Sequence, residues 1–175
     1  MKPRFDGRVS KTSMPDRRWA LAMSHIRIKK DSWCHHTAVF DCCDRNIVEW
    51  CVSKSGKADV DAAAPEDVII KRQPRARLKL RSYNGLFFAS EKFNKVSRSA
   101  RMRQEHITPY TPEQNGVIER WFRTLKSECI WMKQYELVEE ARWAISQFID
   151  VYHKEDPHRS LDMLTPPEWV ERFAP

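Results

Sequence analysis

The stretch from Thr111 to Lys126 places the strongest local constraint on the fold. Four of its apolar residues recur at helical spacing and would form one buried stripe: Ile118, Trp121, Phe122 and Leu125. Thr111 suits the N-cap, Pro112 the first helical position, and Gln114 can complete a capping box with the cap residue. An Asn-Gly step follows, so we expect regular helix from about Val117. The pattern predicts a helix that packs on a core through its aromatic side.

The other side of this predicted helix carries one carboxylate, Glu119, together with Arg123 and Lys126. Taken alone, the spacing favours a solvated face with an ion pair between Glu119 and Arg123. A functional role for Glu119 needs support from the rest of the chain.

The charge of the chain favours a polyanionic partner. The net charge is +7 over 175 residues, and between Lys71 and Arg103 eleven basic residues face one acid, Glu91. Such clustering is typical of nucleic-acid binding. No apolar run approaches the about 18 residues that a membrane span needs, and the first ten residues lack the apolar centre of a signal peptide. We therefore expect an intracellular, cytoplasmic protein that binds nucleic acid, with no membrane and no small-molecule substrate.

The five cysteines argue against a disulfide framework or a zinc ribbon. Their number is odd and no two have C-x-x-C spacing. We expect reduced thiols.

The order of elements predicts an α/β fold. Strand patterns cover 19–28, 33–40, 46–52, 76–82 and 103–107, and the first three form an antiparallel meander. Helix patterns cover 58–70, interrupted by Pro65, then 90–100, 138–152 and 168–173. We expect a basic lead-in at 1–16 and a single domain over 17–175 with a proline-rich tail at 156–175. A mixed five-stranded sheet with helices on both faces, as in the ribonuclease H-like fold, accommodates this order.

Five stretches carry a family resemblance. They are RRWALAMSHI (17–26), HTAVFDCCDRNIVEW (36–50), LRSYNGLFF (80–88), HITPYTPEQNGVIERWFRTLKSEC (106–129) and YHKEDPHRSLDMLTPPEW (152–169). With these motifs the chain resembles the catalytic core of retroviral-integrase-type transposases from bacterial insertion sequences, the product of the second open reading frame. No helix-turn-helix pattern precedes the resemblance, so we do not expect sequence-specific DNA recognition.

The resemblance implies a site of two Asp and one Glu that hold two Mg²⁺ or Mn²⁺ ions for transposition and integration of DNA. The matching positions here are Ala22, Tyr83 and Glu119, with 35 residues between the last two, as in the family. Alanine has no donor atom, and a neutral phenol is a poor ligand. We therefore expect an inactive relic that binds no metal, with Glu119 as the one retained ligand and Asp41 as the best rescue ligand.

The same resemblance and the basic composition suggest where DNA would bind. The expected phosphate contacts are Arg81, Arg101, Arg103, Arg120, Arg123 and Lys126. The expected partners are DNA, bound without sequence preference, and a second copy or another transposase subunit. The alternative is a non-enzymatic module that binds nucleic acid or active transposase subunits.

Overall fold

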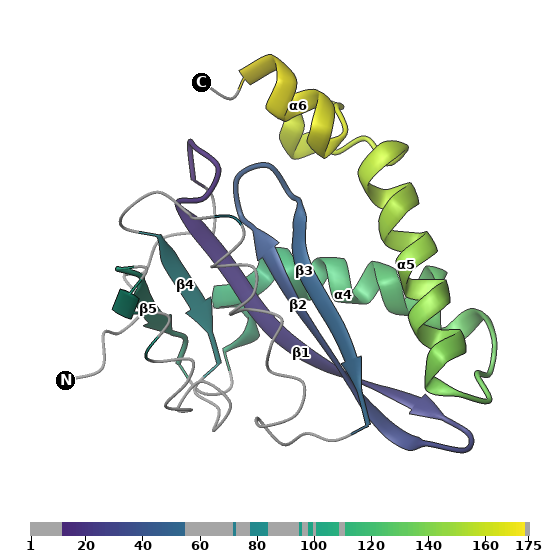
Figure 1. The fold of residues 1–175 in the computed structure, drawn as a ribbon. Coiled ribbons are helices and arrows are strands. Elements are labelled where there is room, and N and C mark those ends of the chain that lie inside the picture. Colours follow the sequence, from purple (N-terminus) through teal and green to yellow (C-terminus); the bar gives the residue numbers. More distant parts are fainter. Residues whose placement is uncertain are drawn as a thin grey trace.

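The computed structural model describes residues 12–54, 72, 78–83, 95, 98–99, 101–108 and 111–173. Its centre is a five-stranded sheet in the order β3-β2-β1-β4-β5 (Figure 1). The strands are β1 (Arg18–Ile28), β2 (Ser32–Asp41), β3 (Ile47–Ser53), β4 (Lys79–Ser82) and β5 (Arg103–His106).

The sheet is mixed. Strand β2 pairs antiparallel with both β1 and β3, whereas β4 runs parallel to β1 and to β5. The prediction of an α/β fold with a mixed five-stranded sheet is therefore confirmed. Parallel neighbours need crossover connections, and those around β4 fall in the segments 55–77 and 84–100, which lie mostly outside the described residues.

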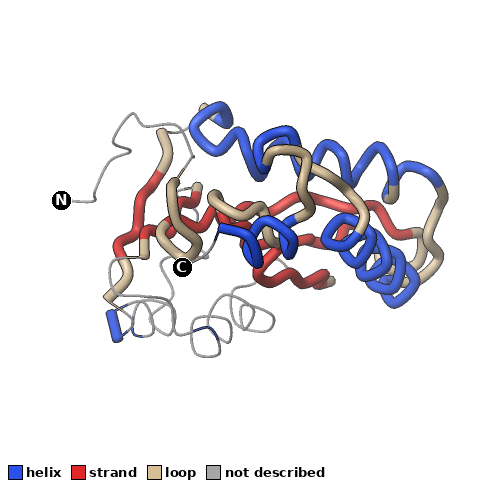
Figure 2. The backbone as a smooth tube through the Cα atoms, turned by 90° about the horizontal axis from the view of Figure 1, so that it is seen from above, coloured by secondary structure: helices blue, strands red, loops and turns tan. Residues whose placement is uncertain are grey.

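Three helices follow the sheet in the chain: α4 (Gly116–Glu128), α5 (Val138–Lys154) and α6 (Pro166–Phe173). Short 3₁₀ turns precede or separate them: η2 (Pro112–Asn115), η3 (Ile130–Met132) and η4 (Arg159–Leu161). Figure 1 shows α4 crossing behind the strands, and Figure 2 shows it as a layer that runs along the sheet.

One face of the sheet packs against α4 and α5. Alternate residues of β1, among them Ala20 and Ala22, meet the aromatic stripe of α4 and the buried side of α5 in one apolar cluster. Trp121 and Phe122 are buried in it, as the helical spacing predicts. The neighbouring β1 residues Trp19 and Leu21 point to the other face and form a second cluster with Leu78 and Leu80.

The start of α4 differs from the expectation. Thr111 makes no side-chain cap, and the first turn is 3₁₀. The expected capping box is wrong because the Gln114 amide bonds to Thr108 instead: Oε1 accepts from the Thr108 backbone N–H (2.8 Å) and Nε2 donates to Thr108 Oγ1 (3.2 Å). Two hydrogen bonds to an earlier loop residue thus replace the local cap.

Other expectations need smaller changes or are not tested. The last helix begins at Pro166 instead of 168. The helices expected at 58–70 and 90–100, and most of the basic lead-in, lie outside the described residues. All five cysteines are free thiols. Within the described ranges no helix has the length and apolar character to cross a membrane.

Candidate functional site

The sheet brings two of the three expected site positions together. Leu21 of β1 pairs with Ser82 of the parallel strand β4, so the next residues, Ala22 and Tyr83, are neighbours at the carboxyl end of β4. The start of α4 is held beside them, since the buried Asn115 donates from Nδ2 to the Leu21 carbonyl (3.5 Å). Residues far apart in the chain therefore meet where ligands commonly bind in α/β folds.

Glu119 reaches this place from the first turn of α4. The Tyr83 hydroxyl donates to Glu119 Oε1 at 2.7 Å. Burial, and then the hydrogen bond to Glu119, raise the pKa of the Tyr83 phenol well above its usual value. The phenol therefore stays protonated and serves as a hydrogen-bond donor to the carboxylate.

Ala22 contributes only packing. Its side chain is 3% exposed and lies in the apolar cluster under α4, against which Tyr83 also packs. A methyl group in this position offers no polar atom to a ligand.

The residues at this site do not fit the pair of divalent metal ions that the resemblance implies. Two bridged Mg²⁺ ions need anionic oxygen ligands that converge from separate elements. Here one carboxylate, one protonated phenol and one methyl group converge. In the described part of the chain, no group of three or more His, Cys, Asp and Glu side chains is arranged to hold a metal ion.

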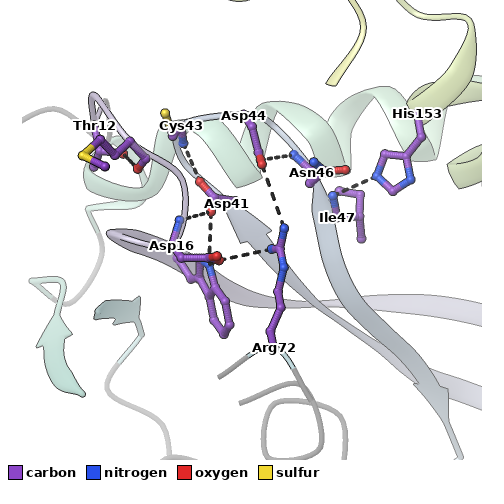
Figure 3. Close-up of polar contacts among 11 residues, drawn as sticks. Thr12, Asp16, Asp41, Cys43, Asp44, Asn46, Ile47, Arg72 and His153 are labelled. Atoms are coloured by element: carbon purple, nitrogen blue, oxygen red, sulfur yellow. Dashed lines mark hydrogen bonds and ion pairs between the residues drawn. The ribbon is translucent and has the colours of Figure 1, made fainter. Parts of the chain in front are cut away.

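Asp41 does not point toward Glu119. It lies opposite Trp19, on the sheet face away from Ala22 and α4. Its carboxylate accepts hydrogen bonds from the backbone N–H groups of Asp16 and Cys43, both at 2.7 Å, and from Trp19 Nε1 at 3.2 Å (Figure 3). The prediction of Asp41 as a rescue ligand is therefore wrong, because the side chain closes the turn after β2 and anchors the segment before β1.

Charged groups around Asp41 form a small network that sequence reasoning missed. Arg72 lies 3.3 Å from Asp16 and 4.0 Å from Asp44, and its guanidinium stands 5.9 Å from the ring centre of Trp19. Burial, followed by the neighbouring Asp44 carboxylate, raises the pKa of Asp41 above its usual range. The Arg72 guanidinium offsets the negative charges of Asp16 and Asp44, and the network is structural in character (Figure 3).

The residues expected to contact DNA have different environments. Arg120, Arg123, Arg101 and Arg103 are exposed and Lys126 is half-buried.

The Glu119 carboxylate accepts a hydrogen bond from Tyr83, and no ion pair joins it to Arg123 among the described residues. The expected ion pair between Glu119 and Arg123 is therefore wrong.

Arg81 is a correction to the expected DNA contacts. It is fully buried, its guanidinium pairs with Glu105 at 3.1 Å, and Nη1 donates to the Gln114 carbonyl at 3.0 Å. Arg81 thus ties β4 to β5 and to the turn before α4, and it cannot reach a phosphate from there.

Glu105 is the centre of a second buried charge cluster. Arg18, Lys79 and Arg81 approach its carboxylate at 3.5, 3.0 and 3.1 Å. The four residues come from β1, β4 and β5. No local pattern reveals the cluster, since the strands that supply it become neighbours only in the sheet.

Comparisons with known proteins show which sequences and folds this chain is similar to. The family model described as integrase core domain matches residues 100–166, which include Glu119 and exclude Ala22 and Tyr83. Among solved structures, the chain is similar to the simian T-cell lymphotropic virus intasome in complex with PP2A regulatory subunit B56 gamma, with a TM-score of 0.73 and 18% identity over 100% of this chain and 60% of that one. It is also similar to the HTLV-2 integrase catalytic core domain with magnesium (dimeric form), with a TM-score of 0.58 and 14% identity over 93% and 98%. The fold is therefore that of the integrase catalytic core, with its ribonuclease H-like sheet.

The curated relatives of the chain are transposases of insertion sequences. The chain is 20% identical over 159 residues to the putative transposase InsK of element IS150 from Escherichia coli K12, covering 91% of this chain and 56% of the relative. It is 23% identical over 143 residues to the putative transposase InsD of element IS2E from the same strain, covering 79% and 66%. The chain is thus similar to the insertion-sequence transposases of the integrase-core family. It spans roughly half to two thirds of the length of these relatives.

Proposed function

We propose that this chain is the core of an insertion-sequence transposase that has lost metal-dependent chemistry and keeps a DNA-binding surface. The observation that carries the proposal is the 2.7 Å hydrogen bond from Tyr83 to Glu119. In the family resemblance these two positions, with Ala22, hold acids. Here the phenol occupies the side of the carboxylate from which a second acid would complete the site.

Two further observations support the loss of chemistry. Ala22 is buried among apolar side chains, so the first position offers a ligand neither a polar atom nor an exposed surface. Asp41 accepts three hydrogen bonds on the other sheet face and would have to break them to serve as a ligand. Bridging two Mg²⁺ or Mn²⁺ ions needs anions from separate elements, and Glu119 alone does not supply them.

DNA binding rests on exposed positive charge. Arg123 and Lys126 share the side of α4 that carries Glu119, and Arg120 directly follows Glu119 in the helix. Arg101 and Arg103 add exposed guanidinium groups at and just before β5. Contacts of this kind give affinity without base recognition and make binding salt-dependent.

The test of the proposal is a nicking and strand-transfer assay. The purified protein, with Mg²⁺ or Mn²⁺, is incubated with a supercoiled plasmid and with a duplex that has a precut end. We expect no product above that of the Glu119→Gln variant. Products that require the metal and disappear in Glu119→Gln would overturn the proposal.

A second candidate function is a non-enzymatic subunit that joins active transposases. The outer side of α5 favours it, because Trp143 is 65% and Val151 50% exposed on a helix whose other side is buried. Large apolar side chains exposed on one face often mark a protein interface. We expect the wild type to have the mass of a dimer in light scattering and Trp143→Glu that of a monomer; a monomeric wild type, or a dimeric variant, contradicts this role for α5.

A further inference from the structure

A groove of about 960 Å³ runs along a flank of α4 that differs from the Glu119 flank. From α4 its lining includes Gly116, Val117, Arg120 and Thr124, whereas Glu119, Arg123 and Lys126 take no part in it. At 3.6 residues per turn the two sets lie on opposite sides of the buried stripe. The groove is therefore separate from the expected site of chemistry.

The opposite wall of the groove is held in place by hydrogen bonds between distant segments. Arg45, in the turn between β2 and β3, donates from Nε to Ser160 Oγ at 3.1 Å. Tyr152 of α5 donates from its hydroxyl to the Arg45 carbonyl at 3.2 Å, and the Ile47 backbone N–H donates to His153 Nε2 at 2.9 Å. These bonds join the β2–β3 turn, α5 and η4 into one wall, and the Tyr152 ring lies 6.4 Å from the Trp121 ring of α4, between ring centres.

Three guanidinium groups line this groove: those of Arg45, Arg120 and Arg159. Two carboxylates, Glu113 and Asp156, oppose them. Neither Arg120 nor Arg159 forms an ion pair with any acid among the described residues, and both are exposed. Unpaired guanidinium groups on both walls suit phosphate oxygens, which they bind in a bidentate manner.

We propose that this groove binds the phosphate backbone of DNA, as a contact separate from the Arg123 and Lys126 side of α4. The proposal rests on the proposed DNA binding and adds where a second stretch of backbone lies. A DNA backbone fits better than a small anion, because the arginines stand on two walls of an open groove and a backbone offers a row of charges. Helix α4 then contacts DNA on two flanks.

The test is fluorescence anisotropy with a labelled duplex of about 30 base pairs over a range of salt concentrations. The variants are Arg120→Glu/Arg159→Glu, which replaces two positive charges in the groove by two negative ones, and Asp156→Asn, which removes one negative charge. The control is Lys30→Glu/Lys133→Glu, with the same change in net charge at the far end of the sheet, where the β1–β2 turn contacts the α4–α5 connection. Circular dichroism melting checks the fold of each.

We expect the arginine pair variant to lose at least about 10-fold in affinity at about 0.1 M salt, with a salt slope shallower by about 2. Asp156→Asn should bind a few-fold more tightly, an effect that misfolding cannot produce. The control should lose less than the arginine variant.

The outcomes separate this inference from the proposed function. Wild-type protein that fails to bind the duplex at low salt contradicts the proposed DNA binding and the groove together. Wild-type binding that changes equally in the arginine variant and the control, or does not change in either, contradicts the groove alone.

Discussion

The hydrogen bond from Tyr83 to Glu119 should contribute measurably to the free energy of unfolding. The change is Tyr83→Phe, which removes the hydroxyl and keeps the ring that packs on the core. A hydrogen bond to a charged group is worth about 1.5–3 kcal/mol when both partners are shielded. Tyr83 and Glu119 are only half-buried, and solvent screens the carboxylate. We therefore expect the hydrogen bond to contribute about 1 kcal/mol to the free energy of unfolding.

A double-mutant cycle isolates this energy from the other effects of each substitution. Tyr83→Phe, Glu119→Ala and the double variant are unfolded in urea, and the coupling is the departure from additivity. A loss of about 1 kcal/mol at the melting temperature also lowers the melting point by about 2–4 °C in a chain of this length. Thr124→Ala with Tyr83→Phe provides a control cycle, because Thr124 lies on another flank of α4.

The cycle also has a clear negative result. A coupling below about 0.3 kcal/mol, equal to that of the control cycle, would show that Tyr83 and Glu119 do not interact in solution. The assignment of Tyr83 as a group that occupies the site would then lose its main support.

Three other predictions concern stability. Burial lowers the pKa of His36 to about 3. Because the unfolded chain therefore binds this proton at a higher pH than the folded chain, the free energy of unfolding falls as pH drops below about 6.5, by up to about 1.4 kcal/mol per pH unit. His36→Phe should remove one proton's share of this slope in urea unfolding between pH 7.5 and 5. Glu105→Gln leaves three cations without their shared anion and should lower the free energy of unfolding in urea by about 3–5 kcal/mol. The control is Glu136→Gln, in an exposed pair with Lys29, which should change the free energy of unfolding little. Equal effects of the two variants would contradict the buried cluster. Gly116→Ala should stabilise by about 0.4–1 kcal/mol, since Gly116 has a helical φ of −55° and open space where the alanine methyl group would lie; a loss in melting temperature would contradict the helical start at this residue.

The sequence predicted the parts of the fold that depend on local periodicity. The stripe on α4 and the three-strand meander follow from side-chain spacing within one segment, and the structure has both. The start of α4 was predicted less well, because the hydrogen-bond partner of Gln114 is Thr108 in the preceding loop.

The candidate site was predictable in outline because the motifs fix the register between distant segments. Glu119 and Tyr83 meet as the resemblance implies. The burial of Arg81 was not predictable, since its partner Glu105 comes from a strand that approaches only when β4 and β5 pair. The orientation of Asp41 depends in the same way on Trp19 across the β1–β2 pair.

We propose that two replaced ligands at positions 22 and 83, and not the scaffold, account for the loss of chemistry proposed for this chain. Calorimetric titration with Mn²⁺ tests it most directly, on the wild type, on Ala22→Asp/Tyr83→Asp, and on the same double variant with Glu119→Gln. We expect binding only in the variant that restores both acids and keeps Glu119. Glu119-dependent Mn²⁺ binding by the wild type, or none by the restored variant, would contradict the claim.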